Sequence, residues 1–427
     1  MPPATLLSTL PQLGNLLARN STESLSISST PVSQYLARQW RNPNDILSVL
    51  MLLGPDVVQT AVAQVAGRAV TPLAFSFGWA AYAFNALLAT VGNGRLMPDA
   101  TTPGSTLVIG AASGHIRTTY SWLLSKFLED FNERIDREME DEQAHPNPRD
   151  SKNTPLVPQS GLQKIVKPEW EALRVSVYEV DRSSPIAHGV PTLDWVWFSG
   201  VAVIIAQLIL AMLPWVMDND WVPFMIIASG NVLVLFGAWL PQWKEEKWSC
   251  PKNGGATVTV TQGNGSRNAI VILKSEGAGL DFEILAQGTR TLKPSAASRL
   301  VTAVLACLWV MLLVTVAGIS QNTWWLLGIG LLGTIQNLVA AGSSRSPSAL
   351  GLHLKHKETM RGASLAKVLK EVEERYLLVG SSLVNVFFPG SLRAKGDDLT
   401  FWQNAMKARM ASNEYGSRVD VWDPLGS

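Results

Sequence analysis

Six polar side chains stand inside stretches of the sequence that contain no charged residue. They are Asn85, Gln207, Ser229, Asn231, Gln336 and Asn337. Amide and hydroxyl groups in apolar surroundings either form hydrogen bonds between helices or line a polar path for a solute. Proton relays and ion pathways normally use ionisable groups, and these stretches also lack histidine. We therefore favour interhelical hydrogen bonding, with a pore lined by amides as the alternative.

Patterns that would indicate an enzyme or a bound cofactor are missing from the sequence. His353 and His356 are three residues apart, but no Cys or carboxylate stands at a matching spacing, so we expect surface histidines rather than metal ligands. The glycine-rich stretch 263–266 lacks the lysine of a phosphate-binding loop and predicts a turn. The sequence contains no Gly-x-Ser-x-Gly and no His-Glu-x-x-His. We expect no enzyme activity, no cofactor and no metal.

The elements that carry the six polar side chains are indicated by where charge is missing. The chain has 427 residues, of which 16% are charged, against about 25% in ordinary soluble domains. Four windows without Asp, Glu, Lys or Arg have the length of membrane spans: 69–94, 195–217, 221–243 and 300–344. This pattern excludes an ordinary soluble enzyme, and the two cysteines exclude a disulfide scaffold. A net charge of +1 gives no field that would attract nucleic acid.

The windows predict a polytopic α-helical membrane protein with two helical hairpins and one further span. The longest window is too long for one helix and predicts spans at 300–319 and 324–341, separated by the polar residues 320–323. Spans at 195–217 and 221–243 are joined only by residues 218–220, as in a tight hairpin. The further span, 70–91, is rich in Ala, Gly and aromatic residues, which suits close helix packing.

The stretch 46–67 leaves the number of spans at five or six. Pro55 and Asp56 interrupt an otherwise apolar run there, and an Asp in mid-membrane costs about 3 kcal/mol on insertion scales. We favour a helix that lies at the interface or packs on the bundle over a sixth span. Residues 1–45 are predicted to form a disordered tail.

Lysine and arginine indicate the orientation of the spans. The hairpin tips contain none, whereas segments 95–194, 244–299 and 345–427 hold 31 of the 35 basic residues. Cytosolic loops carry the excess of basic residues, so we expect these three segments in the cytosol and the tips in the lumen or outside the cell. Five spans would put the N-terminus on the luminal side, where the sequon at Asn20 would be glycosylated.

The three cytosolic segments contain regular patterns of their own. Helices are predicted at 117–142 and 364–378, a strand at 173–180 and a β-hairpin at 257–261 and 269–273. Together the segments offer the apolar surface of a modest domain. We therefore expect a small α+β domain, built from three discontinuous pieces, beneath the helical bundle.

Several motifs resemble a family of uncharacterised integral membrane proteins of filamentous fungi. These motifs are PLAFSFGW at 72–79, GNGRLMP at 92–98, DWVWFSG at 194–200, LPQWK at 240–244, the stretch 263–272, and FPG at 388–390. The resemblance extends from about residue 45 to residue 393. It implies no activity, cofactor or catalytic residue. Some similar proteins are encoded beside secondary-metabolite biosynthesis genes, which implies an accessory role.

Two functions follow from the sequence. The first is a membrane scaffold or accessory component, with the lipid bilayer as its surroundings and a cytosolic protein as its partner. The alternative is a transporter or channel for a small uncharged or amphiphilic molecule, using Asn231, Gln336 and Asn337. The two functions differ in whether these amides line a wet cavity or close a solid core.

Overall fold

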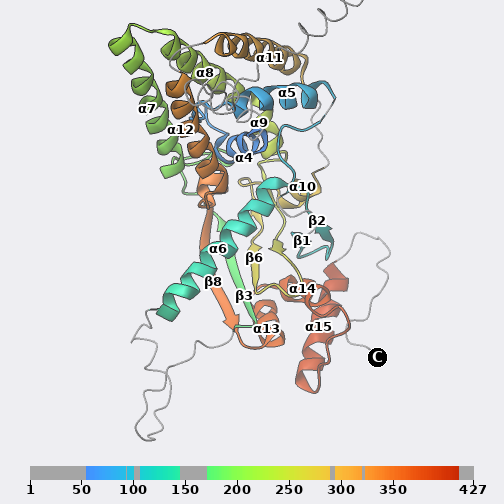
Figure 1. Ribbon diagram of the computed structural model, residues 1–427. Helices are drawn as coiled ribbons and strands as arrows, with labels where there is room; N and C mark the ends of the chain where they lie inside the picture. Colours follow the sequence, from blue (N-terminus) through green and yellow to red (C-terminus); the bar gives the residue numbers. More distant parts are fainter. Residues whose placement is uncertain are drawn as a thin grey trace, which may run out of the picture.

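The computed structural model describes residues 54–92, 94–100, 106–144, 171–288, 294–319 and 323–412. The predictions for the tail 1–45, for residues 46–53 and for Asn20 lie outside these residues. In the described part, apolar helices gather at one end of the molecule and a β-sheet with further helices lies at the other end (Figure 1).

Three of the apolar helices are long and apolar enough to cross a membrane: α7 (Trp195–Asp218), α11 (Ala296–Ala317) and α12 (Thr323–Gly342). Helix α8 (Val222–Ala238) reaches that length only together with α9 (Pro241–Lys247), to which it is bent by 42°. The described chain therefore holds three such helices, or four if the bent pair counts as one span. Shorter helices α4 (Pro55–Val65) and α5 (Gly78–Val91) complete the bundle.

Only one of the two predicted hairpins is a packed pair of helices. Helices α7 and α8 lie against each other, but α11 packs mainly on α5 and α8, whereas α12 packs mainly on α7 and α4. The prediction of a second hairpin at 300–341 was wrong in this respect. Its reasoning assumed that neighbours in sequence are neighbours in space, but an apolar helix face can pack on any matching face.

The helix predicted over 70–91 begins only at Gly78, and the residues before it, 71–77, form no helix; we name them the extended segment. Residues 66–77 contain no helix, and residues 71–77 are all buried. Pro72 lacks an N–H group and restricts the residue before it to extended conformations. The 11-residue α4, within the stretch 46–67, is about 16 Å long and packs against α5 and α12, so it is a helix packed on the bundle.

The sheet at the other end combines strands from all three segments that were predicted to form one domain. Its order is β2-β1-β5-β6-β3-β8, with β3 and β6 parallel and the other neighbours antiparallel. The strands are β1 (Leu107–Gly110), β2 (Ile116–Thr118), β3 (Leu173–Val180), β5 (Val258–Thr261), β6 (Asn268–Ile272) and β8 (Leu354–Gly362). Two short strands, β4 (Gly254–Gly255) and β7 (Ser275–Glu276), pair separately. Strand β3 coincides with the predicted strand, and β5 with β6 forms the predicted hairpin.

Helices cover both faces of this sheet (Figure 1). Helix α6 (Trp122–Ala144) packs on one face and shares its apolar core with the bundle. Helices α13 (Leu365–Arg375) and α14 (Val379–Phe387) cover the other face and form a separate core with α15 (Asp397–Ser412). A further short helix is α10 (Phe282–Gln287). Helix α6 begins five residues later than predicted, because Ile116–Thr118 pairs with β1 as strand β2.

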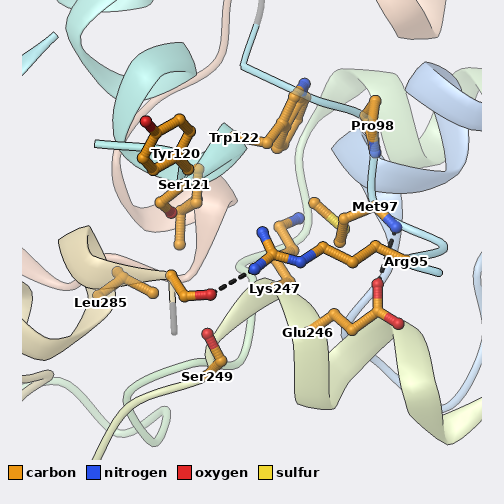
Figure 2. A pocket seen from close by; sticks show the side chains of 12 residues that line it. Arg95, Met97, Pro98, Tyr120, Ser121, Trp122, Glu246, Lys247, Ser249 and Leu285 are labelled. Carbon is orange, nitrogen blue, oxygen red and sulfur yellow. Dashed lines mark hydrogen bonds between the residues drawn. The ribbon is translucent and has the colours of Figure 1, made fainter. Parts of the chain in front are cut away.

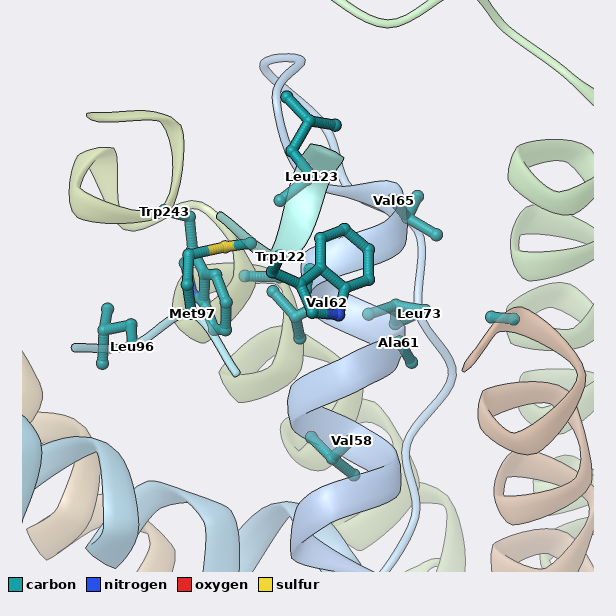
Figure 3. Close-up of a cluster of buried hydrophobic side chains, with 14 of the residues drawn as sticks. Val58, Ala61, Val62, Val65, Leu73, Leu96, Met97, Trp122, Leu123 and Trp243 are labelled. Carbon is teal, nitrogen blue, oxygen red and sulfur yellow. The ribbon is translucent and has the colours of Figure 1, made fainter. Parts of the chain in front are cut away.

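The two parts of the molecule meet at the first turn of α6. Trp122 and Leu123 are buried there together with Val62 of α4 and Trp243 of α9 (Figure 3). The same cluster includes sheet residues such as Ile272. The apolar core is therefore continuous from the bundle into the sheet, and the two parts are not joined by a loose linker.

Candidate functional site

Glycines make room for the extended segment in the interior of the bundle. A Cβ atom at Gly333 of α12 would lie 1.8 Å from the carbonyl oxygen of Phe75. A Cβ atom at Gly200 of α7 would lie 1.9 Å from that of Pro72. Two more helical glycines face aromatic rings of the same segment: Gly230 and Gly330. Residues 71–77 therefore fill a space between the helices that exists only because glycine stands at these four positions.

Two amide side chains accept hydrogen bonds from the backbone of this segment. Gln336 Oε1 accepts the N–H of Ala74 at 3.1 Å. Asn231 Oδ1 accepts the N–H of Phe75 at 3.1 Å. Within the described residues, the N–H groups of Ala74 and Phe75 have no backbone acceptor, so these two bonds supply what a helix would otherwise have provided.

Two further amides donate to the carbonyl groups of the same residues. Gln207 Nε2 donates to the carbonyl of Phe75 at 2.8 Å and to that of Ile329 at 2.9 Å. Asn337 Nδ2 donates to the carbonyl of Ala74 at 3.1 Å and to Ser76 Oγ at 3.0 Å. The four amides therefore come from three different helices and meet at the backbone of two adjacent residues, Ala74 and Phe75.

This arrangement satisfies a backbone segment that has no helical hydrogen bonds. Such backbone must find its partners inside the protein, because a buried N–H or C=O group without a hydrogen bond costs free energy. Here it is buried and bonded to side chains. Of the six predicted polar residues, Asn85 and Ser229 do not take part: Asn85 is exposed on α5, and Ser229 Oγ contacts Met225 Sδ at 4.0 Å.

A second polar site lies where α4 ends, at the junction of the bundle and the sheet domain. Lys247 Nζ donates to the carbonyl of Gln64 at 3.0 Å and to that of Ala66 at 3.2 Å. The last carbonyls of a helix have no partner within it, and a cation is favourable at this end of the helix dipole. The ammonium group also lies over the rings of Trp248, at 4.9 Å, and Trp122, at 5.9 Å. Lys247 is 1% exposed, so its Nζ is a structural hydrogen-bond donor of the junction.

Arg345 joins three elements at the same junction. Its guanidinium forms a two-pronged ion pair with Asp194 at 2.7 and 2.8 Å and donates to the carbonyl of Gln64. Asp194 also accepts the N–H of Trp197 and thereby caps the N-terminus of α7. The Arg345 side chain is 1% exposed, so this pair is a buried contact between the ends of α4, α7 and α12.

Asp130 of α6 ties the sheet domain to the same cluster. Its carboxylate accepts the backbone N–H of Arg345 at 3.1 Å and forms an ion pair with Lys126 at 3.0 Å. Burial raises the pKa of Asp130 above its ordinary value, while Lys126 and the Arg345 N–H oppose that rise. The carboxylate is therefore held by partners from its own helix and from the end of α12.

A small cavity, which we name the junction pocket, opens beside this cluster (Figure 2). Its volume is about 30 Å³, room for about two waters. Its polar and aromatic lining comes from three separate parts of the chain: Arg95, Tyr120, Ser121, Trp122, Lys247 and Ser249. The Arg95 guanidinium reaches into the middle of the pocket and donates to the carbonyl of Gly288.

The histidines that were considered as metal ligands are engaged elsewhere. His353 Nε2 lies 2.9 Å from the carbonyl of Val190, and His356 Nε2 lies 2.8 Å from Thr359 Oγ1. His353 is buried rather than on the surface, because the loop before α7 covers it. Within the described residues, no group of three or more metal-ligating side chains was found.

Sequence reasoning missed the junction cluster. Lys247 and Arg345 entered only among the basic residues that orient the spans, and Asp194 entered only as the first residue of the motif DWVWFSG. The sequence did contain one signal. Asp194 directly precedes the window 195–217 and Arg345 directly follows the window 300–344, so each charge stands at the end of an apolar helix. Which acid meets which base could not be read from that position.

The structure defines a class of protein: an apolar helical bundle built around an extended segment, fused to an α+β domain from three chain segments. The chain matches no protein-family model, no curated protein and no solved structure. The function is therefore argued from the geometry of this molecule.

Proposed function

We propose that the protein is a multi-pass membrane protein that acts as a scaffold or accessory component and presents its sheet domain to a cytosolic protein partner. The outer surface of the bundle supports the membrane setting. Large apolar side chains there are more than half exposed, on four helices: Phe198, Ile205, Ile209, Phe236, Met311 and Leu338. Patches of this kind are rare on soluble monomers, and lipid would cover them.

We propose four crossings, formed by α7, by α8 with α9, by α11 and by α12, and a re-entrant segment in place of the further span. The segment 66–95 begins and ends beside α9, since Lys247 bonds Ala66 and lies in the same pocket as Arg95. Between these ends it reaches Phe77, which lies against Gly330, about 18 Å along α12 from its end at Gly342. The segments that form the sheet domain hold most of the basic residues of the chain, which favours a cytosolic sheet domain.

One experiment tests this topology. A glycosylation tag inserted at Asn219, between α7 and α8, is expected to be modified, whereas the same tag at Gly265, between β5 and β6, is expected to stay unmodified. Modification at Gly265 would contradict the cytosolic sheet domain. Glycosylation at Asn20 would require one more crossing before residue 54, and an Asn20→Gln variant with unchanged migration would argue against it.

The observation that carries the scaffold proposal is the use of the four buried amides. Gln207, Asn231, Gln336 and Asn337 bond the backbone at 74 and 75, and the bundle's glycines close around the same segment. A transporter would need such groups to face a solute. These amides instead form hydrogen bonds within the protein. This favours a bundle that serves as a membrane anchor, with the contacts to a partner made by the sheet domain.

Cysteine accessibility distinguishes the two functions. In a background lacking Cys250 and Cys307, a membrane-impermeant thiol reagent is expected to leave Asn337→Cys unlabelled and to label Glu245→Cys, which is exposed on α9. Labelling of Asn337→Cys in the folded protein would indicate a water-filled path and would favour the transporter.

A genetic test bears on the accessory role. Deletion of the gene with metabolite profiling is expected to lower the amount of a secondary metabolite without accumulating it inside the cell. An intracellular compound that accumulates on deletion and is cleared by the wild-type gene would contradict the scaffold and identify a transported substrate.

A further inference from the structure

The junction pocket has Arg95 as its exposed basic side chain. Lys247 also lines it, but its Nζ is buried and bonded to the carbonyls of Gln64 and Ala66, and Glu246 is the nearby carboxyl group. Both oxygens of Glu246 are occupied: Oε2 accepts the N–H groups of Leu96 and Met97 at 2.8 and 2.9 Å, and Oε1 accepts Gln242 Nε2 at 2.6 Å. This carboxylate is therefore engaged with the protein, and none of its distances to Arg95 is that of a salt bridge.

Arg95 has donors to spare. A guanidinium carries five N–H groups, and within the described residues that of Arg95 has one hydrogen-bond acceptor, the neutral carbonyl of Gly288. Its side chain is exposed, so an incoming group can reach it. Arginine favours planar, two-pronged contacts with carboxylate and phosphate oxygens, and a carbonyl does not satisfy that preference.

Hydroxyl groups surround the guanidinium. Ser121 precedes α6 and Ser249 follows α9, and both line the pocket. In the part of the chain that the structure describes, neither hydroxyl forms a hydrogen bond. Tyr120, which is 64% exposed, adds a third hydroxyl at the rim. One guanidinium with free hydroxyls from two separate elements suits a compact oxyanion with several oxygens.

The position of the pocket fits such a ligand. It lies at the end of the bundle, beside α9 and the first turn of α6 (Figure 2). Exposed tryptophans stand at the same end: Trp195 begins α7 and Trp239 follows α8. Tryptophan is enriched at the level of lipid headgroups. A phosphate at this level could belong to a lipid or to a free solute, and both present the same oxygens to Arg95.

We propose that the junction pocket binds a phosphate group, with Arg95 as the charged donor and Ser121 and Ser249 as hydroxyl donors. The volume of about 30 Å³ admits part of the group and leaves the rest at the mouth, where a lipid tail or solvent would begin. Only the lipid source rests on the proposed membrane setting. The bond from Arg95 to the carbonyl of Gly288 uses one of its five N–H groups, so it can persist on binding and connect the ligand to the end of α10.

Thermal unfolding of the full chain tests the proposal with three probes: inorganic phosphate in detergent, nanodiscs of phosphatidylcholine, and nanodiscs that also contain phosphatidic acid. Wild-type protein is expected to be stabilised by inorganic phosphate, by phosphatidic acid, or by both. Stabilisation by phosphatidic acid alone assigns a lipid, and stabilisation by inorganic phosphate alone assigns a free ligand. No stabilisation by either one would overturn the proposal.

The variants separate this site from general charge attraction. Arg95→Gln is expected to weaken the apparent affinity about tenfold or more, because it removes a charge-assisted contact. Lys244→Gln is the matched control, since it removes one positive charge from an exposed position on α9 outside the pocket. An equal loss in both variants would overturn the proposal.

A second variant keeps the test independent of the arginine. Ser121→Ala combined with Ser249→Ala leaves all charges in place and is expected to weaken binding several-fold. Unchanged affinity in this double variant would overturn the role of the hydroxyls. If the protein proves not to insert into membranes, the proposed function fails, but the inorganic phosphate measurement still decides whether the pocket binds an oxyanion.

Discussion

The carboxylate of Asp194 and the guanidinium of Arg345 meet at 2.7 and 2.8 Å across 151 residues of sequence. Asp194 begins one apolar helix, and Arg345 follows another. The pair therefore fixes the ends of α7 and α12 to each other, and the bond from Arg345 to Gln64 adds the end of α4. Three helix ends are held at one depth by one guanidinium.

Arg345→Met is expected to destabilise the protein by about 3 kcal/mol, because removing one partner of a buried pair leaves the other charge uncompensated. Thermal or denaturant unfolding in nanodiscs measures the loss. The control is Arg137→Met, which breaks an exposed pair with Glu133 on α6 and should cost less than about 1 kcal/mol. Equal stabilities for the two variants would refute the structural role of Arg345.

Gly333→Ala is expected to prevent the extended segment from taking its place. The new Cβ atom would lie 1.8 Å from the carbonyl oxygen of Phe75, where nothing flexible can give way, so a loss of at least about 3 kcal/mol or failure to fold is expected. Gly328→Ala on the same helix has nothing within 4 Å of its Cβ. It is expected to be neutral or to stabilise the helix by up to about 1 kcal/mol. Yield and melting temperature of the two variants give the comparison.

Gln207→Met keeps the size of the side chain but leaves the carbonyl of Phe75 without its donor. A buried polar group without a partner costs about 1–3 kcal/mol, so a clear drop in unfolding free energy is expected. Asn85→Leu is the control, because Asn85 is an exposed amide on α5, and its replacement is expected to change stability by less than about 0.5 kcal/mol. A Gln207→Met protein as stable as Asn85→Leu would show that the bonds to Phe75 contribute little.

The sequence indicates these amides but not their partner. Charge-free windows fix the length and position of α7, α11 and α12 closely, because lipid-length apolar runs have few alternatives. Period-two patterns placed β3 and the β5–β6 hairpin for a similar reason. The amides then required hydrogen-bond partners, and other helices were the obvious choice.

The extended segment could not be found in this way, because its residues are as apolar as those of a helix. Pro72 alone hinted at a break, and helices that cross membranes often tolerate proline. The glycines Gly200 and Gly333 were visible, but small residues also mark ordinary helix contacts. Only their common distance to one backbone shows what they make room for. The pairing of Asp194 with Arg345 is equally a property of the assembled bundle.

Acidification is expected to destabilise the sheet domain through His188. This residue lies between β3 and α7, with its ring 5.6 Å from that of His353. Burial lowers the pKa of His188 below its ordinary value, and His353 adds to this effect. The unfolded chain, with a histidine pKa of about 6.5, therefore binds protons more readily than the folded protein. Stability from this group is present above about pH 6.5 and is lost as the pH falls below it.

Unfolding at pH 7.5 and pH 5.5 measures this loss, and His188→Gln is expected to reduce the difference between the two values. Lys252 also lowers the pKa of His188, whereas Asp181 opposes the shift. The pKa of Asp181 is itself lowered by its hydrogen bonds to Ser183, so its own titration falls below this pH range. His115→Gln, at an exposed turn between β1 and β2, should retain the wild-type difference. If His188→Gln retains it as well, the pH dependence has another origin and the burial of His188 carries no cost on protonation.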